Sequence, residues 1–293
     1  MTRNDSKVFK RTKKILWDFF HRNCLKKLSN PHNIIPRKEL TLNEEKLISL
    51  AKRRLPDLQQ ILKIGIEFIK KEKAHLLNPE YIKSHFSECA TALESSAFNV
   101  YLKNQEDIFH SVIEEWVIQN ADFLNSLYKK FPIPQDYSKE LCKYFYPIVQ
   151  KLEFDFSQTR KARGGKTFEH IVEYLLKETG ISCERPLGDA RRVLKRIDLV
   201  VPSQDVALRL PDKAYFLSCK RTLRERWKQT IPERKPSWRV FLLTVDDSLP
   251  GNKAREIDAL GMIVYVKDEL KEQNHLKKSD WVRKLSDLPR DIR

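Results

Sequence analysis

Residues 193–201 read VLKRIDLVV and residues 214–220 read AYFLSCK, and these two stretches decide the fold class. Both are rich in β-branched or aromatic residues and are bounded by polar or turn-forming residues, which is typical of strands. Two further runs of the same kind follow, WRVFLLTV at 238–245 and MIVYV at 262–266. Segments of helical character separate the later strands, at residues 222–230 and 252–260. This order of elements predicts an α/β fold, with a mixed sheet flanked by helices.

The first half of the chain is predicted to be helical. Only one of the seven glycines precedes residue 160, and glycine costs about 1 kcal/mol relative to alanine inside a helix. Apolar residues recur at helical spacing, as at Ile108, Val112 and Trp116. We therefore expect a helical region over residues 1–150 and an α/β core over residues 151–293.

Some helix boundaries follow from residues that favour helix ends. The sequence NPE at 78–80 is typical of a helix start, because Asn caps and Pro fits the first turn. A strongly amphipathic helix is expected over 166–177, beginning after the glycine pair at 164–165 and ending at Gly180. The basic stretch RKAR at 160–163 is expected to form a loop before it.

The charge of the chain narrows the class of partner. Among 293 residues, 56 are Lys or Arg and 40 are Asp or Glu, a formal net charge of +16. Such a chain favours a polyanion, with nucleic acid ahead of a membrane surface. No apolar run approaches the roughly 18 residues of a membrane helix, so we expect a cytoplasmic protein without a membrane partner. The cysteines show neither a CxxC pair nor zinc-finger spacing, which favours free thiols.

Two carboxylates and a lysine form the candidate catalytic set. Asp198 lies inside a predicted strand, where a lone carboxylate is costly to bury and needs a cation or a metal partner. Lys220 ends the next strand, and Glu233 follows after a helical stretch that could fold it back over the strand ends. Carboxylates that hold Mg²⁺ and a lysine beside the phosphate are suited to phosphodiester cleavage. Each residue taken alone could equally be a solvated charge.

A strongly basic segment adjoins this set. Between residues 215 and 239 there are eight Lys or Arg residues and two Glu residues. Arginine binds guanine through O6 and N7, and a carboxylate accepts from cytosine N4. Arg224, Glu225 and Arg226 are therefore candidates for reading G·C pairs in the major groove, although such a triplet can also be a surface charge cluster.

Residues 218–229, SCKRTLRERWKQ, resemble the signature of the EcoRII, SsoII and PspGI group of type II restriction endonucleases. The resemblance spans about residues 160–266 and implies a PD-(D/E)XK nuclease core with Asp198 and Glu233 as metal-binding acids. It also implies Mg²⁺ as cofactor and recognition of a CC…GG core by the triplet at 224–226. Ser218 stands where most of these nucleases have an acid, and Glu233 takes over that role from the next helix.

The resemblance adds candidates outside this motif. It implies that Glu169 faces the active site as a further catalytic residue and that Phe98 stacks against a flipped central base. Glu169 could equally be a solvated carboxylate, and an aromatic residue at helical spacing such as Phe98 is more often part of the core. The candidates for phosphate contacts are Arg160, Lys161, Arg163 and Arg221.

The expected function is site-specific cutting of double-stranded DNA by a homodimer, or a tetramer, of this chain. Residues 1–150 would supply DNA contacts and dimerisation, and residues 151–293 the catalytic core. The site would be CCNGG or CCWGG, and a DNA methyltransferase would belong to the same restriction-modification system. Two alternatives remain open: a PD-(D/E)XK nuclease acting on DNA structure or damage, and a DNA-binding protein without catalysis.

Overall fold

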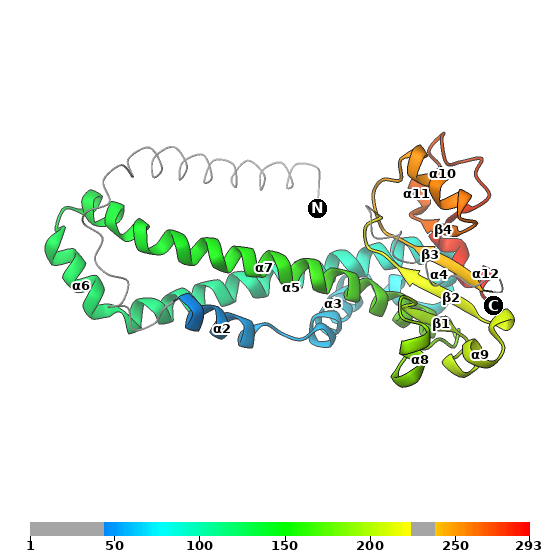
Figure 1. Ribbon diagram of the computed structural model, residues 1–293, viewed down its shortest axis with the longest axis horizontal. Coiled ribbons are helices and arrows are strands. Elements are labelled where there is room, and N and C mark those ends of the chain that lie inside the picture. Colours follow the sequence, from blue (N-terminus) through cyan, green and yellow to red (C-terminus); the bar gives the residue numbers. More distant parts are fainter. Residues whose placement is uncertain (1–43, 224–237) are drawn as a thin grey trace.

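The computed structural model describes residues 44–223 and 238–293, and the structural statements below concern these residues. A long helical hairpin extends from one side of a five-stranded sheet (Figure 1). Its two arms are α5 (Phe86–Gln119) and α7 (Pro134–Glu178), and α6 (Ala121–Lys130) connects them at the far end. The predicted helical character of the first half is confirmed over residues 44–150.

The hairpin has a hydrophobic core of its own. Helices α2 (Glu44–Arg54) and α3 (Leu58–Glu72) pack along it, and the buried residues include Leu47, Val112 and Leu152. Helix α4 (Pro79–Ser84) begins where the sequence predicts, because the side-chain oxygen of Asn78 accepts hydrogen bonds from two N–H groups of the first turn. A short 3₁₀ helix at Ala74–Leu77 joins α3 to α4.

Helix α7 is continuous through the glycine pair, which corrects two predictions. The expected helix start after residue 165 is wrong, and the expected basic loop at 160–163 is helical. Buried Phe156 and Phe168 lie on either side of the glycines and anchor the helix in two different cores, so packing outweighs the intrinsic cost of glycine. The predicted end is confirmed, since Gly180 adopts a φ of 81° just beyond the helix.

The sheet is mixed, as predicted. Its order is β1-β2-β3-β4-β5, with β1 antiparallel to β2 and the remaining pairs parallel. The strands are β1 (Leu199–Val201), β2 (Tyr215–Cys219), β3 (Arg239–Leu243), β4 (Ile263–Val266) and β5 (Val282–Lys284). The first strand is shorter than predicted, because Val193 ends helix α8 (Gly188–Val193). The three residues of β5 are too few to give an alternating pattern, and the sequence does not predict this strand.

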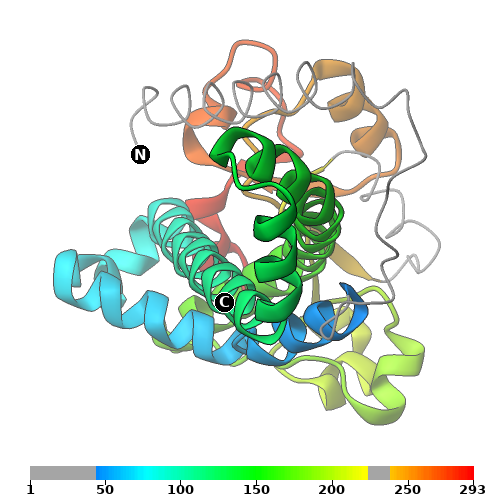
Figure 2. The same ribbon diagram turned by 90° about the vertical axis from the view of Figure 1, so that its left-hand side faces the viewer.

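Helices pack on both faces of the sheet, so the core has three layers. Figure 2 looks along the hairpin from its far end, with the sheet and its helices behind it. On one face, Leu217 packs with Phe168 from the end of α7 and with Leu93 from the start of α5. On the other face, Phe216 stacks on Trp238 at 4.4 Å. That second face also carries α9 (Gln204–Arg209) and α10 (Gly251–Ala259), while α11 (Asp268–Lys271) and α12 (Leu288–Asp291) follow later in the chain.

The hairpin and the sheet are not separated in space. Position 150 lies within α7, and α5 contributes residues to the sheet core at its start and to the hairpin core further along. Among the described residues, none of the helices is both long enough and apolar enough to cross a membrane.

Candidate active site

Asp198 and Lys220 meet where β1 begins and β2 ends. The N–H of Asp198 donates to the carbonyl oxygen of Leu217, which fixes the aspartate at the antiparallel edge. Its Oδ2 accepts hydrogen bonds from the N–H of Cys219 at 2.7 Å and from Nζ of Lys220 at 2.9 Å. The two charged side chains are only 16% and 15% exposed. The structure therefore brings this predicted pair together in a largely desolvated ion pair, where charge–charge interactions are strong.

Glu169 reaches the same region from helix α7. Burial and, after it, the charge of Asp198 raise the pKa of the Glu169 carboxyl to about 7. The cations Arg185, Lys220 and Lys166 oppose this rise. A carboxyl group whose ionised form is disfavoured by burial and by a nearby carboxylate is typical of catalytic and cation-binding positions.

This donor set fits a divalent cation. Both hydrogen bonds to Asp198 end on Oδ2, so within the described residues Oδ1 receives none and can act as a ligand. A cation beside Asp198 and Glu169 would relieve their mutual repulsion, and carboxylate oxygens are the ligands that Mg²⁺ prefers. Residues 44–223 and 238–293 contain no group of three Asp, Glu, His or Cys side chains that could hold a metal. Glu233, the predicted second metal ligand, lies outside the described residues.

A charged network behind Glu169 was not predicted from the sequence. Nε of Arg185 donates to Glu173 Oε2 at 2.5 Å, and Nη1 lies 2.8 Å from Nε2 of His170. Burial and then the charge of Arg185 lower the pKa of His170 to about 4, so its imidazole is neutral and accepts from Arg185. The sequence offered little signal for it, since Arg185 only stands with Glu184 between a cysteine and a proline in a stretch without periodicity.

The predicted stacking and phosphate candidates Phe98 and Arg221 lie against each other. The Arg221 guanidinium lies 5.2 Å from the centre of the Phe98 ring, and its Nε donates to Oε1 of Glu94. Phe98 is 37% exposed, more than a core aromatic would be. A small cavity adjoins this cluster, and Tyr101 and Gly164 are among its lining residues.

The other basic candidates on α7 differ in their surroundings. Arg160 donates to Gln105 Oε1 at 2.6 Å and to Glu153 Oε1 at 2.7 Å. Arg163 donates to the carbonyl oxygen of Pro56, and its guanidinium lies 5.8 Å from the ring centre of Tyr101. Lys161 is exposed. The base-reading candidates Arg224, Glu225 and Arg226 lie outside the described residues.

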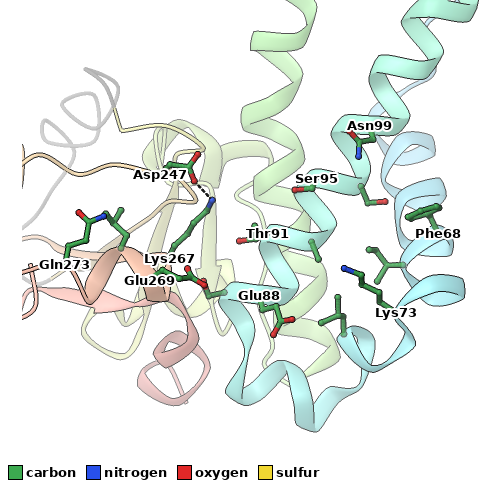
Figure 3. Close-up of a pocket in the computed structure, with 16 residues that line it drawn as sticks. Phe68, Lys73, Glu88, Thr91, Ser95, Asn99, Asp247, Lys267, Glu269 and Gln273 are labelled. Atoms are coloured by element: carbon green, nitrogen blue, oxygen red, sulfur yellow. Dashed lines mark hydrogen bonds and ion pairs between the residues drawn. The ribbon is translucent and has the colours of Figure 1, made fainter. Parts of the chain in front are cut away.

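A second, larger cleft lies between α5 and the segments that follow β3 and β4 (Figure 3). Its volume is about 750 Å³. Thr91, Ser95 and Asn99 face it at four-residue spacing along α5, and on the opposite side Lys267 pairs with Asp247 at 2.6 Å. None of the predicted site residues that the structure describes lines this cleft.

Comparisons with known proteins give one family match and one curated relative. The family described as EcoRII C terminal matches residues 138–288. The type II restriction enzyme SsoII of Shigella sonnei is 30% identical over 124 residues, which cover 39% of this chain and 40% of that protein. The chain thus aligns with about two fifths of the length of this curated relative. These matches confirm the resemblance drawn from residues 218–229.

Two solved structures show the same fold. One is metal-depleted Ecl18kI in complex with uncleaved DNA, with a TM-score of 0.70 and 19% identity over 86% of this chain and 84% of that chain. The other is a complex of the restriction endonuclease PspGI with substrate DNA, with a TM-score of 0.54 and 20% identity over 83% and 93% of the two chains. The predicted restriction-endonuclease-like fold is confirmed.

Proposed function

The chain belongs to the EcoRII C terminal family, and from this premise we propose that it is a type II restriction endonuclease that cuts both strands of a CC…GG DNA site. The observation that carries the proposal is the ion pair between Asp198 and Lys220, with Glu169 beside it. Two carboxyl groups and a lysine at the end of a sheet are the groups that cleavage of a phosphodiester requires.

Each residue of the pair has a chemical task in this proposal. Asp198 and Glu233 would hold Mg²⁺, which would supply Lewis-acid chemistry at the phosphate. Lys220 stays close to Asp198 and neutralises charge that develops on the phosphate oxygens. Glu169, with a pKa near 7, can accept a proton at neutral pH.

Recognition of the DNA sequence is assigned to residues 224–226, which follow the catalytic lysine. Arg224 and Arg226 would contact guanines and Glu225 cytosines, one half-site for each subunit of a homodimer. The site would be CCNGG or CCWGG, with Phe98 as the stacking surface for a flipped central base. Lys161 would contact phosphates, and Arg160, Arg163 and Arg221 would do so after exchanging their present partners.

Digestion of a plasmid of known sequence with Mg²⁺ tests the proposal. We expect discrete fragments whose ends map to CC…GG sites, and no cutting in excess chelator. Smeared products or a dependence on DNA structure would instead support a structure- or damage-directed nuclease. An intact plasmid that is nevertheless bound would support a DNA-binding protein without catalysis. Mapping cut ends on a random-sequence library then identifies the central and flanking pairs.

A further inference from the structure

Arg185 makes two side-chain contacts to helix α7 close to Glu169. Its Nε and Nη1 reach Glu173 and His170 at 2.5 and 2.8 Å, and both partners belong to helix α7. His170 directly follows Glu169, and Glu173 lies one turn further along the helix. Through these two contacts the guanidinium is bound to the turn of α7 that carries Glu169.

The same residue is anchored to the sheet through its own backbone neighbour. Glu184 pairs with Val200 of β1 through two backbone hydrogen bonds of 2.9 and 2.8 Å. Val200 is two residues from Asp198 along the chain. Arg185 thus connects the helix that carries one active-site carboxyl with the strand edge that carries the other.

The third nitrogen of this guanidinium has no partner. Nη2 of Arg185 is buried and makes no hydrogen bond within the described residues. An unpaired buried donor costs free energy, so its presence calls for an explanation. The charge of Arg185 acts on Glu169, where it favours the ionised form. Because Nη2 is inaccessible from outside, it is not placed to contact a DNA phosphate, which argues against a direct role in the reaction.

We infer that Arg185 is a positioning residue of this site, which holds the carboxylate of Glu169 at a fixed place relative to Asp198. The inference rests on the proposed function, because it concerns the groups assigned to cleavage there. Displacement of a catalytic group by about 1 Å can lower a rate by about 100-fold. Loss of Arg185 releases the turn of α7 and also removes the cation that favours the ionised carboxylate.

Single-turnover cleavage by Arg185→Ala and Arg185→Lys tests this role. We expect the alanine variant to cut on the order of 100-fold more slowly, to need more Mg²⁺ for its half-maximal rate, and to bind duplex in Ca²⁺ as the wild type does. The lysine variant keeps the positive charge but lacks the several N–H donors of the guanidinium, so it should recover part of the rate. A variant that is merely less folded would cut a smaller fraction of the DNA in a single turnover. It would keep both the rate constant and the half-saturating Mg²⁺ concentration of the wild type.

Arg54→Ala is the matched control. Arg54 also joins two helices, through hydrogen bonds to Ser111 and Glu115 at 2.5 and 2.7 Å, but it lies on the hairpin. Its substitution should leave the rate constant and the Mg²⁺ requirement unchanged. Equal effects of the two alanine variants on the rate constant would overturn the inference.

A stability measurement tests the inference independently of cleavage. At pH 8 without divalent cations, Glu169→Gln should raise Tm more in the Arg185→Ala background than in the wild type, because the carboxylate has then lost its nearby cation. Equal shifts in both backgrounds would show that the two residues do not interact and would overturn the inference. If the wild type cut no DNA, the proposed function would fail, and this comparison would still decide the role of Arg185.

Discussion

Nζ of Lys220 lies 2.9 Å from Oδ2 of Asp198, and both side chains are largely shielded from water. The lysine follows the last residue of β2 and the aspartate precedes the first residue of β1, so an antiparallel pairing of two short strands creates the contact. The strand pairing alone therefore brings these two groups together.

Substitution of Lys220 tests the catalytic importance of this contact. Lys220→Ala should lower the single-turnover rate by roughly 100-fold or more, because charge on the phosphate oxygens is no longer neutralised. Binding of duplex in Ca²⁺ should persist, as it should for Asp198→Ala and Glu233→Ala. Lys277→Ala is the control, since this lysine is exposed and pairs with Glu272 at 3.4 Å, away from Asp198 in the sequence. Near-wild-type cutting by a Lys220 variant would remove that lysine from the site.

Glu169 predicts a pH dependence of stability. Its pKa is raised from 4.5 to about 7, first by burial and then by Asp198. The folded state therefore binds more protons than the unfolded chain between these pH values, so the free energy of unfolding falls as pH rises through this window. Glu169→Gln should stabilise the metal-free protein by up to roughly 3 kcal/mol at pH 8, and by almost nothing at pH 4. Thermal melts at several pH values measure this, and a constant difference between the two proteins would contradict it.

Arg226 should affect sequence discrimination and Lys161 should not. Arg226→Ala should lose about 1–3 kcal/mol of discrimination for each half-site while keeping weak, salt-sensitive binding to any duplex. Lys161→Ala should weaken binding to cognate and altered duplexes about equally. Competition binding at fixed salt with single-pair-substituted duplexes measures both. If Arg226→Ala weakened all duplexes alike, the residue would contact phosphate and not a base.

Glu94 should restrain the DNA affinity of this protein. Its carboxylate pairs with Arg221, which also covers Phe98, so a phosphate that binds Arg221 must displace it. Glu94→Gln should therefore tighten binding to any duplex by about threefold to tenfold and steepen its salt dependence. Glu115→Gln, in another acid–arginine pair on α5, is the control. Weaker cognate binding by Glu94→Gln would indicate that Glu94 itself contacts DNA.

The glycine pair of α7 offers a test of helix continuity. A Cβ on Gly165 would meet no atom within 4 Å, so Gly165→Ala should stabilise the protein by about 0.5–1 kcal/mol. Gly65 on α3 is the contrasting case, because a Cβ there would lie 3.2 Å from the backbone nitrogen of Ala97 on α5. Gly65→Ala should destabilise. Denaturant melts compare the two, and a loss of stability in Gly165→Ala would argue against an uninterrupted helix.

Local chemistry was enough to predict part of this architecture. The strand at Tyr215–Cys219, the helix start at Asn78 and the pairing of Asp198 with a cation follow from composition, capping and the cost of burying a lone charge. Lys220 was predicted to be that cation because it ends the neighbouring strand in the sequence. These features depend on neighbours in sequence or on a single strand pairing.

Features that depend on distant packing were not predictable in this way. Two adjacent glycines and an RKAR run normally mark a break, but cores on both sides of them hold α7 straight. The partners of Arg185 and Arg221 lie on other helices, at Glu173 and Glu94, and no spacing in the sequence connects them. Short strands such as β5 acquire their conformation from the neighbouring strand.

Helix α7 also has a consequence for how the molecule unfolds. Its 45 residues form a rod of about 68 Å, at 1.5 Å per residue, and the rod contributes buried side chains at both ends. Opening the hairpin core would expose a long stretch of α7 and weaken the packing of this helix against the sheet. The hairpin and the sheet should consequently melt as one cooperative unit, so that amides near Leu152 and near Leu175 exchange their hydrogens through the same global opening.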